Sequence, residues 1–322
     1  MPYSSNDVVA AANAASKRIQ DVVRRTPLRH SPHFSAASGA DVYLKLENHQ
    51  TTGSFKFRGA SNRLLSLTQA ERERGCVAAS SGNHGAAVAC AMQKLGIRGV
   101  IFVPEQTSAA KVDAIRSYAG EVRFFGSDGL DTEQHARAFA ADNGMYYLSP
   151  YNDPQVIAGQ ATCGLEIAAQ LPGVDAVFVA VGGGGLISGV GSVLKAHNPE
   201  LRVFGCQPEV SAVMAKSVAA GELLDLPSGP TLSDGTAGGI EPQAITFELC
   251  RELVTEFVLV SEAQIAAAMR DYIAAYDEAV EGAAGVALAA LLHRKEAVAG
   301  SKVAVIICGG NVSQKVIDRI LL

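Results

Sequence analysis

A lysine that follows a glycine turn is the first residue in a chemically useful position. Lys56 lies in the segment TGSFKFRG (52–59), and a helical pattern continues from it through residues 60–67. Ser54 is a candidate N-cap, which would place Lys56 in the first helical turn, where the positive end of the helix dipole disfavours an ammonium group. A fixed amine with a lowered pKa can attack a carbonyl group and form a Schiff base. The segment predicts a covalent anchor for a carbonyl compound, against the ordinary alternative of a surface lysine.

Two further turns, each between a predicted strand and a predicted helix, suit anions. The segment SSGNHG (80–85) follows a strand that ends at Ala79, and its backbone N–H groups and two hydroxyl groups are placed to bind a carboxylate or a phosphate. The segment GGGGL (182–186) has four glycines, which let the backbone surround a tetrahedral anion at a helix N-terminus. Each segment has a simpler alternative, an ordinary N-capped turn for the first and a flexible turn for the second.

Other motifs carry less information by themselves. The segment CGGN (308–311) follows the last predicted strand and EGAAG (281–285) opens a late helix, but spacing alone assigns neither any chemistry. His30 and His33 have no further Cys or acidic ligand nearby, so no metal site is predicted there. The dinucleotide fingerprint GxGxxG fails because Ser188 stands at its third glycine position, and the sequence has no GxxxxGK(S/T) motif. A nicotinamide or P-loop nucleotide site is therefore disfavoured.

Short β-branched runs alternate with helical patterns along the chain. This order is typical of an α/β protein with parallel, doubly wound sheets, in which active sites lie at the carboxyl ends of strands. The segment 221–243, rich in Gly, Pro and Asp, is predicted to be a loop. The expected strands are 42–47, 77–80, 99–104, 122–126, 176–185, 202–207 and 302–311, and the expected helices include 83–95, 108–119, 130–142, 155–170, 186–196 and 261–276.

Length and composition exclude several classes of protein. A chain of 322 residues exceeds what one hydrophobic core usually serves, so two lobes are expected, and without a linker segment they are expected to be interleaved in sequence. The net charge of −5 with scattered basic residues argues against nucleic-acid binding. No stretch reads as a membrane span or a secretory signal, and six irregularly spaced cysteines are expected to be reduced, so we expect a cytosolic protein.

The ordered set TGSFKFRG, SSGNHG, GGGGL and GGN resembles the pyridoxal-phosphate enzymes of the tryptophan-synthase-β fold (fold type II). The likeness is to the serine/threonine dehydratase and serine racemase branch, and it extends to RTPL (25–28), NDPQVIAGQATCGLEI (152–167), SDG (233–235) and EGAAGVALAALL (281–292). It implies two doubly wound parallel-sheet lobes. Residues 1–68 and 150–322 would form the large cofactor-binding domain and 69–149 the small domain. No C-terminal regulatory domain is expected, and a homodimer is implied.

The resemblance also implies a role for each candidate residue. Lys56 would be the Schiff-base lysine, and Ser81 would face the substrate Cα from the opposite side as a second proton donor. The substrate carboxylate would bind at Ser80, Ser81, Asn83 and His84. The remaining cofactor contacts would be Phe55 on the ring, Asn83 on the ring hydroxyl, Gly182, Gly183, Gly184 and Gly185 around the phosphate, Gly235 and Glu281 beside the ring, and Cys308 at the pyridine nitrogen.

The sequence departs from the pattern of the branch in two respects. Cys308 stands where serine is usual, and since a thiol is a weak donor, this favours β-elimination over racemisation. Gln207 and Val213 stand where metal-activated members have an acidic pair, and because divalent cations of this kind require carboxylate oxygens, no metal is expected. Short degradative threonine dehydratases resemble this sequence better.

The expected reaction is the loss of water from a β-hydroxy amino acid such as L-threonine or L-serine, giving a 2-oxo acid and ammonia, in amino-acid catabolism. The sequence does not identify the preferred substrate, and hydroxyaspartate, phenylserine or a hydroxylated diamino acid stay open. Serine racemase and a β-replacement synthase are the nearest alternatives. A non-catalytic anion sensor is an alternative of a different class.

Overall fold

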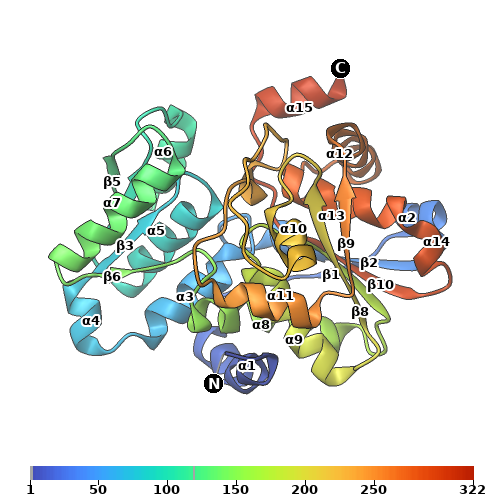
Figure 1. Ribbon diagram of the computed structural model, residues 1–322, viewed down its shortest axis with the longest axis horizontal. Helices are drawn as coiled ribbons and strands as arrows, with labels where there is room; N and C mark the ends of the chain where they lie inside the picture. The colour runs from blue at the N-terminus through green and yellow to red at the C-terminus, as the bar shows by residue number, and fades with distance from the viewer. Residues whose placement is uncertain (1–2, 119) are drawn as a thin grey trace.

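The computed structural model describes residues 3–118 and 120–322, which form two sheets with helices around them (Figure 1). The larger sheet has the strand order β1-β2-β10-β7-β8-β9, and the smaller has the order β5-β4-β3-β6. Every neighbouring pair is parallel except β1 and β2 at one edge. The strands are β1 (Leu28–His30), β2 (Asp41–Leu46), β3 (Cys76–Ala79), β4 (Gly99–Val103), β5 (Glu121–Phe124), β6 (Tyr146–Tyr147), β7 (Ala176–Ala180), β8 (Arg202–Pro208), β9 (Glu256–Val260) and β10 (Lys302–Ile307).

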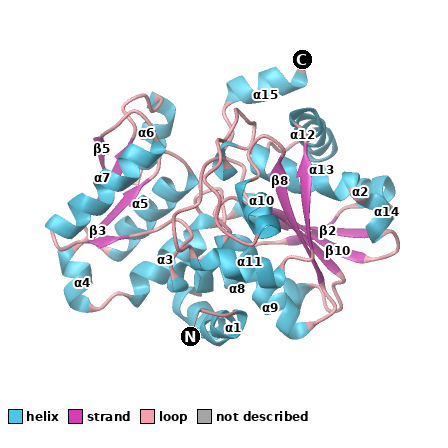
Figure 2. Cartoon of the chain, in the orientation of Figure 1, coloured by secondary structure: helices cyan, strands magenta, loops and turns pink. Residues whose placement is uncertain are grey.

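Helices surround both sheets, and helix α3 and several loops lie between them (Figure 2). Helix α13 packs across β7, β8, β9 and β10, and α8 packs along α9. The helices are α1 (Ser5–Ile19), α2 (Pro32–Ser38), α3 (Lys56–Ser66), α4 (Gln69–Arg74), α5 (Asn83–Leu95), α6 (Ala109–Arg116), α7 (Gly129–Asp142), α8 (Pro154–Gln170), α9 (Gly185–His197), α10 (Val213–Ala220), α11 (Ile245–Leu253), α12 (Glu262–Tyr276), α13 (Gly282–His293), α14 (Lys295–Val298) and α15 (Gln314–Leu321), with short 3₁₀ turns η1 (Glu47–His49) and η2 (Asp234–Thr236).

The α/β class with two parallel-sheet lobes is confirmed, and so are the seven expected strands. The strands β7 and β10 end four or five residues earlier than expected, at Ala180 and Ile307, because the glycine segments that follow them leave the sheet and line the cavity described below. The ends of β2, β3, β4 and β5 differ from the expected ones by one or two residues. The expected helix 108–119 ends at Arg116, and residue 119 lies outside the described residues. The segment 221–243 is a loop apart from η2, as expected.

The strands of the smaller sheet all lie within residues 76–147, and those of the larger sheet lie before and after this span. The two lobes are therefore interleaved in sequence, as expected. The boundaries at 68/69 and 149/150 stay a prediction, because α3 packs both on α5 beside the smaller sheet and on α8. Among the described residues, no helix combines the length and the apolar character that a membrane crossing requires.

The crossing of α3 over α8 depends on two glycines. A Cβ atom on Gly159 would lie 2.6 Å from the Cα of Gly59, and one on Gly59 would lie 2.4 Å from Nε2 of Gln160. Larger residues at either position would push the helices apart. Because Lys56 is the first residue of α3, this close contact fixes where Lys56 can lie.

Candidate active site

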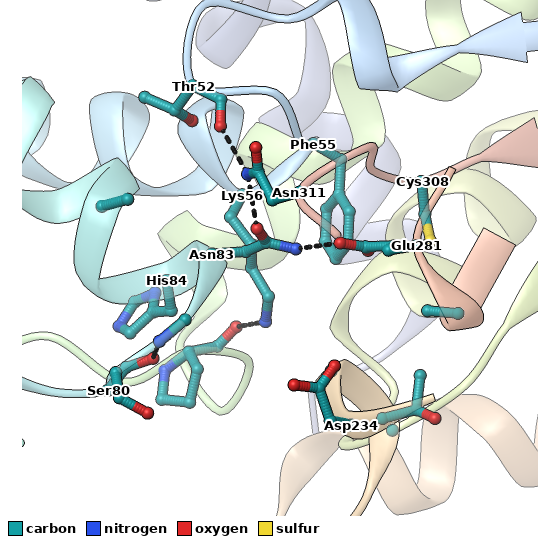
Figure 3. A pocket seen from close by; sticks show the side chains of 18 of the residues that line it. Thr52, Phe55, Lys56, Ser80, Asn83, His84, Asp234, Glu281, Cys308 and Asn311 are labelled. Carbon is teal, nitrogen blue, oxygen red and sulfur yellow. Dashed lines mark hydrogen bonds between the residues drawn. The ribbon is translucent and has the colours of Figure 1, made fainter. Parts of the chain in front are cut away.

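A cavity of about 730 Å³ lies between the two sheets, at the carboxyl ends of β3, β7 and β10 (Figure 3). This is the position expected for a site in parallel α/β sheets. All the residues singled out from the sequence line this cavity: Phe55, Lys56, Ser80, Ser81, Asn83, His84, Gly182, Gly183, Gly184, Gly185, Gly235, Glu281 and Cys308.

Lys56 begins α3, but the expected cap was wrong. Phe55 is the N-cap residue and makes no side-chain capping bond, while Ser54 instead forms an isolated antiparallel bridge with Gly309. The backbone N–H of Phe55 donates to the carbonyl of Cys308 at 3.1 Å. The turn before Lys56 is thus held by the loop after β10, a contact that local sequence does not reveal.

The Lys56 amine has few polar neighbours. Its Nζ donates to the carbonyl of Pro150 at 3.0 Å and lies 5.2 Å from the centre of the Phe55 ring. Burial lowers the pKa of Lys56 to about 8, and the negative charge of Glu281 opposes this shift. At neutral pH a useful fraction of the amine is therefore unprotonated, which is the form that attacks a carbonyl group.

Residues 80–84, which form the loop after β3 and the first residues of α5, make up one wall of the cavity. The first N–H groups of a helix have no acceptor within the helix, so α5 presents donors here. Ser80 Oγ accepts from the backbone N–H of Gly82 at 3.2 Å. The buried His84 ring lies 3.0 Å from the carbonyl of Leu148, and burial lowers its pKa to about 3. His84 is therefore neutral and its ring donates to a main-chain acceptor, so it brings no positive charge to the cavity.

The four glycines between β7 and α9 form a closely packed turn. Gly184 has a φ of 86°, in the left-handed region that favours glycine, and it is the N-cap of α9. A Cβ atom on Gly183 would lie 2.3 Å from the ring of Tyr151, and one on Gly185 would lie 3.0 Å from the Tyr151 Cβ. Side chains cannot be added here, so the backbone itself faces the cavity at a helix N-terminus, as an anion cradle requires.

Hydrogen-bonded side chains link the opposite walls of the cavity (Figure 3). The Asn311 amide donates to the carbonyl of Thr52 at 2.8 Å and to Oδ1 of Asn83 at 2.7 Å. The Asn83 amide donates to Oε2 of Glu281 at 2.7 Å, and the Cys308 thiol donates to Oε1 of Glu281 at 3.6 Å. Asn311 had no role in the sequence interpretation. Its only signal was the GGN triplet after the last strand.

Glu281 and Cys308 are both buried and influence each other's protonation. Burial raises the pKa of Glu281 to about 7, and the hydrogen bond from Asn83 opposes the shift. Burial also raises the pKa of the Cys308 thiol, and the charge of Glu281 adds to this increase. Cys308 is therefore a neutral thiol that can donate only one weak hydrogen bond.

The outer rim of the cavity contains an ion pair between the two lobes. Lys111 of α6 lies 3.0 Å from Asp234, the residue before Gly235 in η2. Both side chains are largely exposed, so this pair contributes little to stability. Gly235 reaches the cavity through its backbone, which is consistent with a position beside a ligand.

Gln207, at the end of β8, is nearly fully buried, and its side-chain amide forms hydrogen bonds with two main-chain groups. Its nitrogen donates to the carbonyl of Val181 at 3.0 Å, and its oxygen accepts from the N–H of Ala215 at 2.8 Å. Val213 is buried at the start of α10. Among residues 3–118 and 120–322, no group of three or more His, Cys, Asp or Glu side chains is arranged to hold a metal ion.

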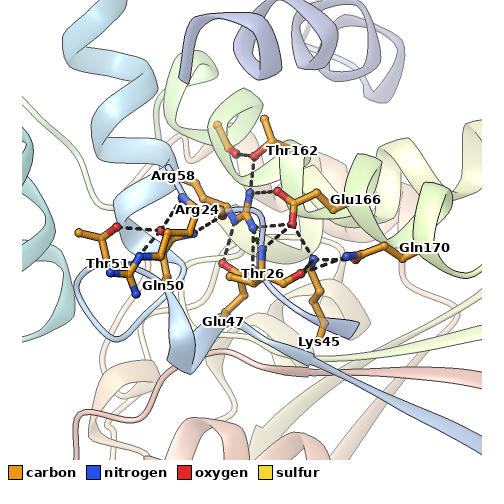
Figure 4. A network of polar contacts seen from close by, with 11 residues as sticks. Arg24, Thr26, Lys45, Glu47, Gln50, Thr51, Arg58, Thr162, Glu166 and Gln170 are labelled. Atoms are coloured by element: carbon orange, nitrogen blue, oxygen red, sulfur yellow. Dashed lines mark hydrogen bonds and ion pairs between the residues drawn. The ribbon is translucent and has the colours of Figure 1, made fainter. Parts of the chain in front are cut away.

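A buried network of charges surrounds Arg58, two residues after Lys56 in α3 (Figure 4). The Arg58 guanidinium donates to Glu47 at 2.8 Å from both Nε and an NH₂ group, and to Glu166 at 2.7 and 2.9 Å. Lys45 donates to Glu166 at 2.6 Å and to the carbonyl of Thr26 at 2.8 Å. Two cations and two carboxylates therefore balance inside the protein and tie α3 to the end of β2 and to α8.

Comparisons with known proteins agree with this arrangement. The model of the family described as "Pyridoxal-phosphate dependent enzyme" matches residues 19–309. An L-threonine ammonia-lyase of Thermotoga maritima is 42% identical over 307 residues, covering 95% of this chain and 76% of that relative. The catabolic L-threonine dehydratase TdcB of Escherichia coli K12 is 40% identical over 324 residues, covering 99% of this chain and 96% of that relative. The structure of maize serine racemase is similar with a TM-score of 0.92 and 33% identity, covering 97% of this chain and 96% of that one.

Proposed function

The chain belongs to the pyridoxal-phosphate-dependent enzymes, and from that premise we propose that it is an L-threonine ammonia-lyase, a dehydratase that converts L-threonine or L-serine into a 2-oxo acid and ammonia. The observation that carries this proposal is the meeting of Lys56, Asn83, the four-glycine turn and Cys308 around one cavity. Two relatives that act on L-threonine by name are about 40% identical to it over nearly its whole length.

The residues of the cavity fit pyridoxal phosphate. The cofactor has an aldehyde, a ring oxygen, a ring nitrogen and a phosphate, and each has a suitable partner on the cavity wall. Lys56 offers an amine whose pKa is lowered to about 8, and the turn at Gly182–Gly185 leaves no room for side chains where a phosphate would bind. Asn83 would meet the ring oxygen, and Cys308 would meet the ring nitrogen. Phe55 would pack beside the ring.

We assign the chemical work as follows. Bound pyridoxal phosphate supplies an electron sink that stabilises the carbanion left when the α-proton departs. Lys56 Nζ takes that proton, since its lowered pKa leaves the amine able to act as a base near neutral pH. The loop with Ser80, Ser81 and the N-terminus of α5 holds the substrate carboxylate, which fixes the Cα–H bond toward Lys56. The hydroxyl takes up the proton that Lys56 removed and leaves as water, and hydrolysis of the remaining enamine gives the 2-oxo acid and ammonia.

Ser81 supports a second activity on the same site. It lines the cavity from the small lobe, whereas Lys56 enters from α3, and we propose that the two side chains reach Cα from opposite faces. A serine hydroxyl in that position could return a proton and give the D-amino acid. The likeness to maize serine racemase favours this as a minor activity, while the weakly donating Cys308 favours elimination as the main one.

The test is a substrate panel with the purified enzyme and added cofactor. We expect 2-oxo acid from L-threonine and L-serine, a smaller amount of D-serine from L-serine, and no product with the variant Lys56→Ala, which should also lose the visible absorption of the covalently bound cofactor. Hydroxyaspartate, phenylserine and hydroxylated diamino acids complete the panel. Lys56→Ala that keeps ammonia release would contradict the proposal.

Three further properties are proposed with the activity. We propose a homodimer, to be tested by light scattering after gel filtration, and a cytosolic location, to be tested by fractionation. We also propose that residues 69–149 form a small domain and that 1–68 and 150–322 form the large one. Limited proteolysis near residues 68 and 149, yielding a stable fragment of the expected length, would support these boundaries.

A further inference from the structure

The orientation of the Asn83 amide is determined by a residue to which we assigned no role from the sequence. Asn311 lies between the carbonyl of Thr52 and the side chain of Asn83, at 2.8 and 2.7 Å (Figure 3). The Thr52 carbonyl can only accept a hydrogen bond, so the Asn311 atom facing it is the NH₂ group. The Asn83 atom facing that same NH₂ group must then be its carbonyl oxygen.

The hydrogen bond at the other end of this row, between Asn83 and Glu281, agrees with this assignment. The remaining amide atom of Asn83, its nitrogen, lies 2.7 Å from Oε2 of Glu281. Glu281 by itself would not decide the matter, because its pKa near 7 allows it to accept or to donate at neutral pH. The main-chain carbonyl of Thr52 cannot change roles. The donor and acceptor roles in this row of hydrogen bonds are therefore set by the contact between Asn311 and Thr52.

These roles decide what Asn83 presents to a ligand. An amide nitrogen has two N–H groups, and Glu281 uses one of them. The other stays available in the cavity that Asn83 lines. If the amide were reversed, its carbonyl would face Glu281 and the cavity side would offer an acceptor. The ring oxygen of the cofactor would then have to keep its proton in order to donate.

We propose that Asn311 is a positioning residue, which holds the Asn83 amide so that an N–H group faces the ring oxygen of bound pyridoxal phosphate and keeps that oxygen deprotonated. The inference rests on the proposed cofactor use. Position 53 agrees with it, because a Cβ atom on Gly53 would lie 2.5 Å from Oδ1 of Asn311 and displace its side chain.

The test uses the absorption spectrum of the cofactor-loaded enzyme without substrate. Protonation of the ring oxygen moves the absorption of lysine-bound pyridoxal phosphate to shorter wavelength, so the ratio of the long- to the short-wavelength band reports the state of that oxygen. Asn311→Ala is expected to lower this ratio about tenfold, the effect of one hydrogen bond to a charged acceptor. Asn311→Asp is expected to lower it further, since its carboxylate faces the Thr52 carbonyl and can only accept from Asn83.

A double substitution tests whether Asn311 acts through Asn83. Asn83→Ala is expected to lower the ratio, and adding Asn311→Ala to it is expected to change nothing more, because coupled residues are not additive. Gln314→Ala is the control, since that exposed side chain donates to Asp318 on the same helix. Cofactor content and circular dichroism verify that each variant is folded and loaded.

The failures can be told apart. A colourless wild-type enzyme that takes up no pyridoxal phosphate refutes the proposed function. A coloured wild-type enzyme whose Asn311 variants keep the wild-type band ratio refutes the role of Asn311 alone. A full additional effect of Asn311→Ala in the Asn83→Ala background also refutes it, because Asn311 would then act by another route.

Discussion

Replacing Arg58 by methionine is expected to destabilise the folded protein by about 3–5 kcal/mol, because it leaves a buried carboxylate without its cation. In the native network, Arg58 and Lys45 balance Glu47 and Glu166. Lys45 bonds to Glu166 and stays paired, whereas Glu47 is fully buried and loses both hydrogen bonds from the guanidinium. The network then contains one cation and two carboxylates, in place of two of each.

A second substitution distinguishes lost charge balance from lost packing. Glu47→Gln in the Arg58→Met background removes the unpaired charge and restores one cation against one carboxylate. We expect it to recover about 1–2 kcal/mol, since a buried amide is less costly than a buried unpaired ion. If the loss came from packing, the double variant would be no more stable than Arg58→Met.

The destabilisation by Arg58→Met is expected to become smaller as the pH falls. Burial would raise the pKa of Glu47, but the charge and hydrogen bonds of Arg58 outweigh it and lower the pKa. The pairing of Glu47 with Arg58 therefore stabilises the wild type fully above the pKa that Glu47 has in the unfolded chain. This stabilisation is lost as pH falls through the lower pKa that Glu47 has in the folded protein. In Arg58→Met, only the charge of Lys45 and the hydrogen bond from Thr26 still oppose the effect of burial on Glu47. We therefore expect the folded variant to bind a proton more readily than the unfolded chain. The variant therefore approaches the stability of the wild type as pH falls from 7 toward about 4.3.

Thermal unfolding of the cofactor-loaded enzyme, followed by circular dichroism at several pH values, measures these effects. The single variant should melt roughly 6–15 °C below the wild type near pH 7. The reasoning is refuted if Arg58→Met melts within about 2 °C of the wild type, or if the gap between them grows as the pH falls.

Three further outcomes are expected. Gly183→Ala should lose bound cofactor on dialysis at least about tenfold faster than the wild type, because its Cβ would collide with an aromatic ring. The control Gly129→Ala, with open space around it, should retain the cofactor. Equal retention by the two variants would contradict the proposal that the four-glycine turn binds the phosphate. The rate at which the apoenzyme couples to the cofactor should rise with pH around a midpoint near 8 and level off above it, since the unprotonated Lys56 reacts. Glu281→Gln should move this midpoint to lower pH because the carboxylate raises the pKa of Lys56, and an unmoved midpoint would contradict that effect. Removing divalent cations with a chelator should leave the rate within about twofold of the untreated enzyme, because Gln207 bridges its neighbours with its own amide, and a rate restored only by added Mg²⁺ or Ca²⁺ would overturn this.

Local patterns were enough to locate the strands and turns that carry the site. The runs that end at Ala79 and Ala180 are buried strands, and the small residues after them form the turns expected at the carboxyl end of a parallel sheet. Helix α5 begins at Asn83 and ends at Leu95, as its pattern predicts. Hydrophobic periodicity and turn residues act over a few positions, so these features can be read from one sequence.

The contacts that orient the candidate site residues could not be read from local patterns. Asn311 and Asn83 are separated by 228 positions and meet only because β10 and β3 point their carboxyl ends at one cavity. Ser54 was expected to cap α3 because of its type and place, but bridge formation with Gly309 takes its backbone elsewhere. The main-chain acceptor of the His84 ring lies on a segment far along the chain. Tertiary contacts of this kind leave no periodic signal.

The position of β10 has a consequence for the order in which the protein folds during synthesis. This strand is the last along the chain, yet it lies in the middle of the larger sheet, between β2 and β7. Until it leaves the ribosome, the first two strands have no partner on that side and the larger sheet stays in two pieces. The smaller sheet, whose strands are all made by residue 147, can form much earlier. Protease treatment of stalled nascent chains should therefore protect the smaller sheet first, and protection of the larger sheet before β10 emerges would exclude this order.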